Sequence, residues 1–281
     1  MATPLDAIIP ATTSVQTFWN APWVIHAISE QGLKHYDQNT PCEDAYAIGG
    51  TPACSWIVVS DGVSTEPQGR MGALRATHAV STHLANAMSR GEAPGKQLLL
   101  DAYAAAHAAL KAQAHLEKRE LRHFAATLAT TILTKDTIVA ANLGDSSVVG
   151  FTRHLRDGQA VPRLHSLATG LQPPPGQRGT YTIANEQWSS ATTVRETSSP
   201  HIDAVLLATD GGQSFFMQEP DHESDAFYTP FMEIFTRVAE EKDGRRRLIK
   251  FASSFLEREK NLPNSRDDRT IVIAHRQRTV A

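Results

Sequence analysis

Apolar residues near the beginning of this chain fall into short runs that predict β-strands. Each run is bounded by polar or glycine-containing segments, as strands usually are. The strands expected there are Val24–Glu30, Asp44–Ile48 and Cys54–Ser60. The polar stretch from Gly32 to Pro41 is expected to be a loop. Residues 1–21, rich in Thr, Pro and Ala, are expected to be a loose lead-in.

The pattern then changes to a helical period. Apolar residues recur every three to four positions from Met71 to Met88, and again from Pro94 to Leu116. We therefore expect two adjacent amphipathic helices. Two more strands follow, Phe124–Leu133 and Thr137–Leu143, and the short polar break between them predicts an antiparallel hairpin.

The second half of the chain is less regular. Residues 153–200 are Pro-rich and weakly periodic, which favours loops with one or two short strands and makes the region a candidate flap. A strand is expected at Ala204–Ala208 and a last one at Thr270–Ala274. Between these two strands, residues 228–241 and 245–258 read as helices.

This order of elements predicts an α+β fold. Because strands follow one another without intervening helices, parallel βαβ winding is disfavoured. The order fits two antiparallel sheets that pack face to face with helix pairs outside, a four-layer αββα sandwich. Residues 22–277 would form this single domain.

Composition narrows the classes of protein. The 281 residues are 41% hydrophobic with a formal net charge of −3, which gives no electrostatic reason to expect a nucleic-acid or membrane partner. Two cysteines, Cys42 and Cys54, make neither a disulfide framework nor a zinc site. No signal peptide or membrane-length apolar run is found. We therefore expect a cytoplasmic protein with reduced thiols.

Acidic residues at strand ends carry the candidate chemistry. Asp61-Gly62 and Asp210-Gly211 each follow an apolar strand directly. Carboxylates held by rigid elements, beside glycines that permit close approach, suit a hard divalent cation, and an oxygen-only set favours Mg²⁺ or Mn²⁺ over zinc. Three more aspartates touch predicted strands, namely Asp44, Asp145 and Asp267.

Each of these residues also has a simpler interpretation. Taken alone, Asp44 or Asp145 would be assigned to a turn or a helix cap, because aspartate favours both. Asp268 is expected to cap or to face solvent. The twelve histidines contain no HExxH pair and are expected to be structural or on the surface. Thr127 is expected to pack near the central strand and to support the site only indirectly.

Taken together, six short segments resemble the metal-dependent protein phosphatases of type 2C, the PPM family. They have the order and approximate spacing of that family over about residues 22–276. The wording Lys-His-x5-Pro-Cys-x-Asp is similar to a divergent bacterial branch. The segments are Glu43–Ala45, Ser60–Gly62, Ala125–Thr127, Asn142–Ser146, Thr209–Gly211 and Asp267–Thr270.

The resemblance implies a serine/threonine phosphatase that hydrolyses phosphoserine and phosphothreonine by attack of a metal-bridging hydroxide. It implies two Mn²⁺ or Mg²⁺ ions with a possible third, and no protein nucleophile. This agrees with the absence of a Cys-x5-Arg loop. The partners it implies are a phosphoprotein substrate and an opposing serine/threonine kinase in bacterial signalling. We expect a monomer.

Roles carry over from the resemblance to matching positions. Asp61 is similar to the carboxylate that bridges the two main ions, with the Gly62 carbonyl as a further ligand; Asp61 and Asp210 are the catalytic candidates. Asp145 resembles the ligand of the third ion, and Glu43 would hold coordinated water. The complete set of expected metal ligands is Asp44, Asp61, Gly62, Asp145, Asp210 and Asp267.

Two departures from the family pattern leave alternatives open. Val63 stands where many members have a histidine that is proposed to protonate the leaving alcohol. No arginine precedes the Glu-Asp pair to bind the phosphate; Lys34 or His35 could substitute, or the loop could simply be solvated. The alternatives are therefore a pseudophosphatase that binds a phosphoprotein or kinase without turnover, and a hydrolase of another phosphate ester.

Overall fold

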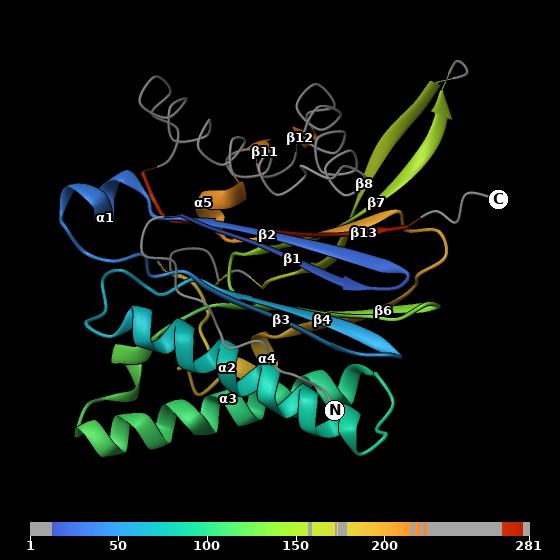
Figure 1. Ribbon diagram of the computed structural model, residues 1–281. Coiled ribbons are helices and arrows are strands. Elements are labelled where there is room, and N and C mark those ends of the chain that lie inside the picture. The colour runs from blue at the N-terminus through green and yellow to red at the C-terminus, as the bar shows by residue number, and fades with distance from the viewer. Residues whose placement is uncertain are drawn as a thin grey trace.

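Two antiparallel β-sheets pack face to face in the computed structural model, which describes residues 13–156, 159–171, 173, 179–213, 217–219, 222–223 and 266–277 (Figure 1). The predicted α+β fold with two antiparallel sheets is confirmed. The larger sheet has the order β1 (Thr13–Asn20), β2 (Trp23–Glu30), β13 (Arg269–Arg276), β10 (Ala204–Ala208), β7 (Ser147–Arg156) and β8 (Gln159–Thr169). The smaller has the order β3 (Ala45–Thr51), β4 (Cys54–Ser60), β5 (Leu128–Leu133), β6 (Thr137–Leu143) and β9 (Thr193–Ser198).

Side chains alternate between the two faces of each strand, and this alternation produces the layers of the fold. In β4, Ile57 and Val59 enter the core between the two sheets, whereas Trp56 and Val58 enter a second core beneath the helices. Successive side chains of a strand point to opposite faces, and both faces of β4 are covered. This explains why the whole run Cys54–Ser60 is buried and apolar enough to be recognised in the sequence.

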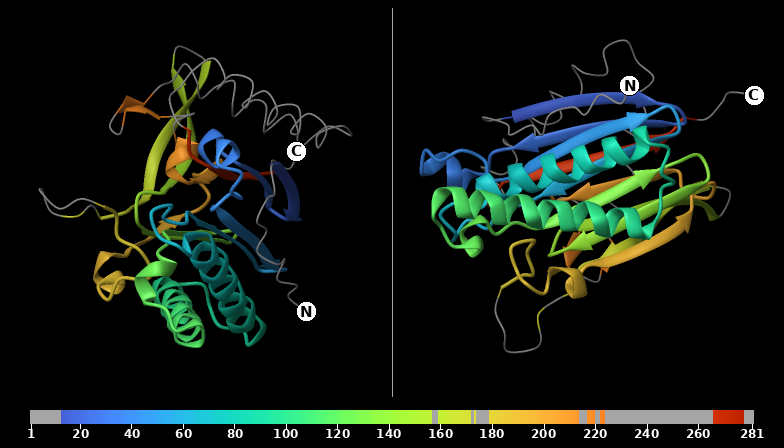
Figure 2. Two further views of the ribbon diagram at one scale, coloured as in Figure 1. Left: turned by 90° about the vertical axis from the view of Figure 1, so that its left-hand side faces the viewer. Right: turned by 90° about the horizontal axis from the view of Figure 1, so that it is seen from below.

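Helices α2 (Gly69–Ser89) and α3 (Lys96–Glu117) lie side by side on the outer face of the smaller sheet (Figures 1 and 2). Both predicted helices are confirmed. None of the described helices is both long and apolar enough to cross a membrane. The helices predicted at residues 228–241 and 245–258 lie outside the described residues. Four short helical elements complete the described part: α1 (Leu33–Asp37), η1 (Leu121–Phe124), α4 (Trp188–Ala191) and α5 (Asp210–Gln213).

The hairpin predicted between β5 and β6 is confirmed. Its turn is closed by a backbone bond in which Thr134 N–H donates to the Thr137 carbonyl over 2.9 Å. The Thr134 hydroxyl oxygen accepts from the N–H groups of Asp136 and Thr137. The short polar break is therefore a turn held by its own threonine. Elsewhere among the described residues, a small two-stranded sheet pairs β11 (Met217–Glu219) with β12 (His222–Glu223).

β13, the last strand of the described chain, lies inside the larger sheet. It pairs with β2 on one side and β10 on the other. Next to β2 it carries a buried ion pair, Arg269 Nη1 to Glu30 Oε2 at 3.5 Å, with both side chains 3% exposed. Burial raises the pKa of Glu30 to about 7, against the opposing effect of Arg269. One strand thus joins the beginning and the end of the described chain.

Three local predictions are wrong. Thr13–Asn20, expected in the loose lead-in, form β1 and pair with β2 along their whole length. Of the region 153–200, residues 153–156 and 159–169 belong to the long β7–β8 hairpin instead of loops, whereas β9 is a short strand of the kind predicted. Pro162 lies in β8, which is an edge strand, the position within a sheet where proline is mostly found. The stretch Gly32–Pro41, expected to be a loop, contains helix α1.

The close packing of α2 generates a stability prediction. A Cβ on Gly72 would lie 2.2 Å from the Phe124 carbonyl oxygen. Overpacking of this kind costs about 1–3 kcal/mol, more than the roughly 1 kcal/mol that alanine gains over glycine in a helix. We expect Gly72→Ala to lower the free energy of unfolding, measured by urea titration. The control Gly95→Ala, whose Cβ meets nothing within 4 Å, should change it by less than about 1 kcal/mol. Equal effects of the two changes would contradict this account.

Candidate metal centre

The five predicted aspartates converge on one end of the sandwich. Asp44 precedes β3 and Asp61 follows β4, and these two strand ends are adjacent because Ala45 pairs with Ser60. In the larger sheet, Ala208 pairs with both Ser147 and Ile271. The ends of β10, β7 and β13 therefore lie together. Asp210, Asp145 and Asp267 stand next to these three ends.

A hydrogen-bonded threonine connects the two sheets at this end. The Thr209 hydroxyl donates to Oδ2 of Asp44 over 2.9 Å, and its oxygen accepts from the Thr270 N–H at 3.0 Å. Asp44 is 1% exposed and Thr209 is fully buried. Thr209 therefore fixes a carboxylate of the smaller sheet against the strand that carries Asp210. This role of Thr209 is not among the predicted ones, although the threonine stands in the Thr-Asp-Gly segment.

Asp61 is held by its backbone. Its N–H donates to the Thr127 hydroxyl oxygen at 3.0 Å, and its carbonyl accepts from the Thr127 N–H at 2.9 Å. Gly62 forms an isolated bridge with Ala126. A Cβ on Gly62 would come within 2.5 Å of the Gly69 backbone, so only glycine lets the loop pass so close to the start of α2.

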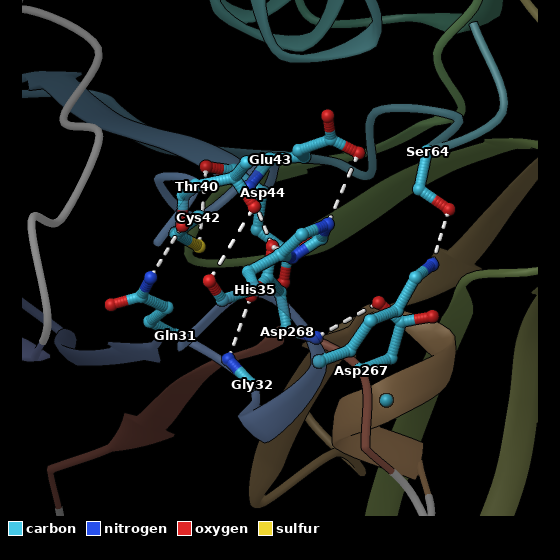
Figure 3. A network of polar contacts seen from close by, with 12 residues as sticks. Gln31, Gly32, His35, Thr40, Cys42, Glu43, Asp44, Ser64, Asp267 and Asp268 are labelled. Atoms are coloured by element: carbon cyan, nitrogen blue, oxygen red, sulfur yellow. Dashed lines mark hydrogen bonds and ion pairs between the residues drawn. The ribbon is translucent and has the colours of Figure 1, made fainter. Parts of the chain in front are cut away.

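Asp268 is a buried anchor beside these ligand candidates (Figure 3). Its carboxylate is 2% exposed and accepts from the N–H groups of Gly32, at 2.7 Å, and Glu43, at 2.5 Å. It therefore caps backbone N–H groups as predicted, but inside the protein and not toward solvent. His35 Nδ1 lies 2.8 Å from Asp268 Oδ2, and His35 Nε2 lies 3.6 Å from Glu43 Oε2.

Both ring nitrogens of His35 thus face carboxylates, and its side chain is 4% exposed. One ligand atom each from His35, Asp267 and Asp268 lies within 4.8 Å of the others. Because both Asp268 oxygens already accept backbone hydrogen bonds, we assign His35 and Asp268 to support of the Glu43 and Asp267 loops, and Asp267 stays a candidate ligand.

Lys34 reaches the site from α1. Its Nζ donates to the hydroxyl of Ser64, three residues beyond Asp61, at 2.6 Å. Ser64 is exposed and Lys34 is partly exposed. Burial raises the pKa of Glu43, while His35 and Lys34 act in the opposite direction. The Lys34 ammonium group therefore lies near the acidic cluster and in contact with solvent.

The aspartates lie in one another's electric field. Burial, followed by Asp44, Asp210, Asp145 and Asp267 in that order, raises the pKa of Asp61 well above its ordinary value. Burial and then Asp268 do the same for Asp44. The pKa values of Asp145 and Asp210 are also raised, mainly by burial. Like charges held together disfavour ionisation, so without a cation these groups lose their protons at higher pH than an ordinary aspartate does.

This donor set fits a hard divalent cation. Every candidate side-chain ligand offers carboxylate oxygens, as Mg²⁺ and Mn²⁺ prefer. Oδ1 of Asp145 is buried and makes no hydrogen bond within the described part of the chain. The structure thus places all five aspartates and Gly62 at one end of the sandwich, with Glu43 beside them. Their roles as ligands stay predictions. Cys42 and Cys54 are buried free thiols, as predicted.

Comparison with solved structures shows the same fold in phosphatases of type 2C. A serine-threonine phosphatase 2C from Toxoplasma gondii matches with a TM-score of 0.64 at 15% identity, covering 96% of this chain and 99% of that one. Serine/threonine phosphatase Stp1 from Staphylococcus aureus has a TM-score of 0.53 at 16% identity, with 96% and 97% covered. The catalytic domain of PstP, solved with two manganese ions, has a TM-score of 0.53 at 18% identity, with 90% and 97% covered.

The sequence itself gives the family. No curated protein matches it. Residues 31–252, however, match the family described as protein phosphatase 2C, a span that contains Asp44, Asp61, Asp145 and Asp210. The six segments identified in the sequence support the same family. The β-sandwich with its acidic end supports it too. This chain belongs to the protein phosphatase 2C family.

Proposed function

We propose that this protein is a metal-dependent serine/threonine phosphatase that hydrolyses phosphoserine and phosphothreonine in proteins, in bacterial signalling opposite a serine/threonine kinase. The observation that carries the proposal is the convergence of aspartates from both sheets at one end of the sandwich, where burial and then neighbouring carboxylates raise the pKa of Asp61 and Asp210. Such a cluster is costly unless positive charge compensates it. Family membership supports the same chemistry.

We assign different roles in the reaction to different residues of this chain. Asp44, Asp61, Asp210 and Asp267, with the Gly62 carbonyl, would hold two Mn²⁺ or Mg²⁺ ions, and Asp145 would hold a third. When bound, such ions activate water and neutralise the phosphoryl oxygens during in-line attack. Glu43 would orient water at the edge of the cluster. The buried anchors Thr209 and Asp268 keep the carboxylates in position.

Lys34 is the group that we assign to the substrate phosphate. His35, the other residue considered for this role, has both nitrogens directed at buried carboxylates. Lys34 instead bonds an exposed hydroxyl that a phosphate oxygen could replace. An ammonium group is a strong hydrogen-bond donor to an anion. The substrate phosphate would then be bound between Lys34 and the acidic centre. The protein would act as a monomer.

A pseudophosphatase is the second candidate. Val63 stands where a leaving-group acid is expected, and its backbone N–H is bonded to the Ala125 carbonyl at 3.0 Å. Neither its side chain nor this N–H can protonate an alkoxide. Retained Mn²⁺ binding and phosphoprotein capture without measurable turnover would favour this reading over the enzyme.

Metal dependence is the first test. We expect the purified protein with Mn²⁺ to release phosphate from a phosphothreonine peptide, and an excess of EDTA to abolish the release, because the carboxylates alone cannot activate water. Phosphate release would be followed colorimetrically. A catalytically active type 2C phosphatase serves as the control. If that control is active and this protein releases no phosphate, the enzymatic proposal fails.

Asp61→Asn separates catalysis from stability. We expect loss of turnover together with a higher melting temperature in EDTA at neutral pH. The pKa of Asp61 is raised in the folded state, so metal-free stability falls as pH rises above the ordinary aspartate pKa, and asparagine removes this loss. Calorimetry in EDTA and peptide assays with Mn²⁺ measure the two effects. The control Asp101→Asn, on the exposed face of α3, should change neither. Normal turnover of Asp61→Asn would refute the metal assignment.

Lys34→Met tests phosphate binding. Loss of a charge-assisted hydrogen bond costs about 1.5–3 kcal/mol, so we expect kcat/KM for a phosphothreonine peptide to fall about 10–100-fold. Mn²⁺ affinity should stay within about threefold of the wild type. Lys111→Met is the matched control, because Lys111 pairs with Glu186 on the surface at 3.3 Å. Equal kcat/KM values for the two variants would exclude Lys34 from this role.

A further inference from the structure

Thr127 is a buried residue that contacts two of the acidic segments. It directly precedes β5, the strand between β4 and β6, and is 1% exposed. Asp61 follows β4, and Asp145 follows β6. The middle strand therefore places one threonine between the two loops that carry these aspartates.

On the side of β4, Thr127 makes three hydrogen bonds, two with the Asp61 backbone and one with the Ser60 side chain. Its hydroxyl oxygen accepts from Asp61 N–H at 3.0 Å, and its own N–H donates to the Asp61 carbonyl at 2.9 Å. The Ser60 hydroxyl donates to the Thr127 carbonyl at 2.5 Å. These bonds fix the direction in which the Asp61 side chain leaves the backbone.

On the side of β6, the same side chain meets the loop of Asp145 through both of its branches. The Thr127 and Ser146 hydroxyl oxygens lie 3.2 Å apart, and Ser146 is 4% exposed. The Thr127 methyl carbon would lie 2.6 Å from a Cβ on Gly144, which adopts a φ of +111°. Gly144 thus allows the loop to pack directly against this methyl group.

We propose that Thr127 is a positioning residue that fixes the Asp61 and Asp145 loops relative to each other, so that cation binding at both depends on its hydroxyl group. The inference rests on the proposed metal centre. Asp61 belongs to the expected main pair of ions and Asp145 to the third, so one hydrogen-bond junction joins two sites that the ligand assignment treats separately. Groups that orient metal ligands are typically worth 10–100-fold in metal affinity.

The test is a calorimetric titration of the full chain with Mn²⁺ alone. We expect Thr127→Val, which keeps the shape and loses the hydroxyl, to weaken Mn²⁺ binding about 10–100-fold. Thr127→Ser keeps the hydroxyl and should stay within about threefold of the wild type. Circular dichroism establishes that each variant is folded.

Thr131→Val is the matched control. Thr131 lies in β5 and is fully buried, and its hydroxyl has no hydrogen-bond partner among the described residues. The same substitution there changes the polarity of the core without touching the acidic loops. Its Mn²⁺ isotherm should equal that of the wild type.

Ser146→Ala tests the junction from its other end, including the case in which Thr127→Val does not fold. Asp61 N–H keeps its acceptor in this variant, so the tighter sites should be retained while the weakest Mn²⁺ site loses affinity. An unchanged weakest site would overturn the proposal.

Other outcomes are equally decisive. A wild-type isotherm for Thr127→Val overturns the positioning role, and so does an equal loss in Thr127→Ser or Thr131→Val, which would indicate packing alone. These results leave the metal centre standing. A wild-type protein that binds no Mn²⁺ overturns the metal centre itself and this inference with it.

Discussion

Mutual repulsion among five aspartates is the constraint on which this structure depends. Asp44, Asp61, Asp145, Asp210 and Asp267 come from both sheets to one end of the sandwich. Like charges brought this close would separate unless the backbone held them. The surrounding hydrogen bonds meet this need: Thr209 joins the sheets, Asp268 caps two loops, and Thr127 holds Asp61. The fold can therefore be understood as a frame that keeps acids together until cations compensate them.

Much of this fold could be predicted from the sequence. Strands that are covered on both faces, and amphipathic helices, have strong patterns of hydrophobic residues. Cys54–Ser60 is buried on both faces, and so it reads as an uninterrupted apolar run ending at Asp61. Strand β1 and the β7–β8 hairpin could not be recognised in the same way. β1 and β8 are edge strands, whose polar residues and Pro162 resemble loop sequence.

The supporting contacts of the site were beyond sequence reasoning for another reason. The bond between Thr209 and Asp44 joins residues 165 positions apart, and Asp268 reaches Glu43 over 225 positions. No local periodicity encodes such pairs. Motif order could place the carboxylates in one centre, but not show that His35 is a buried partner of Asp268 and Glu43. The candidate metal ligands can thus be identified from the sequence, whereas the residues that orient them cannot.

The central position of β13 has a consequence for how the chain is made. β2 and β10 both pair with β13, and neither is bonded to the other within the larger sheet. During synthesis on the ribosome, more than two hundred residues emerge before Arg269–Arg276 can join them. Such long-range pairing is slow and leaves unpaired edges exposed. Because Asp267 and Asp268 precede this strand, the acidic centre is assembled only after the sheet closes. Until this strand has been added, the cluster lacks both Asp267 and the Asp268 anchor.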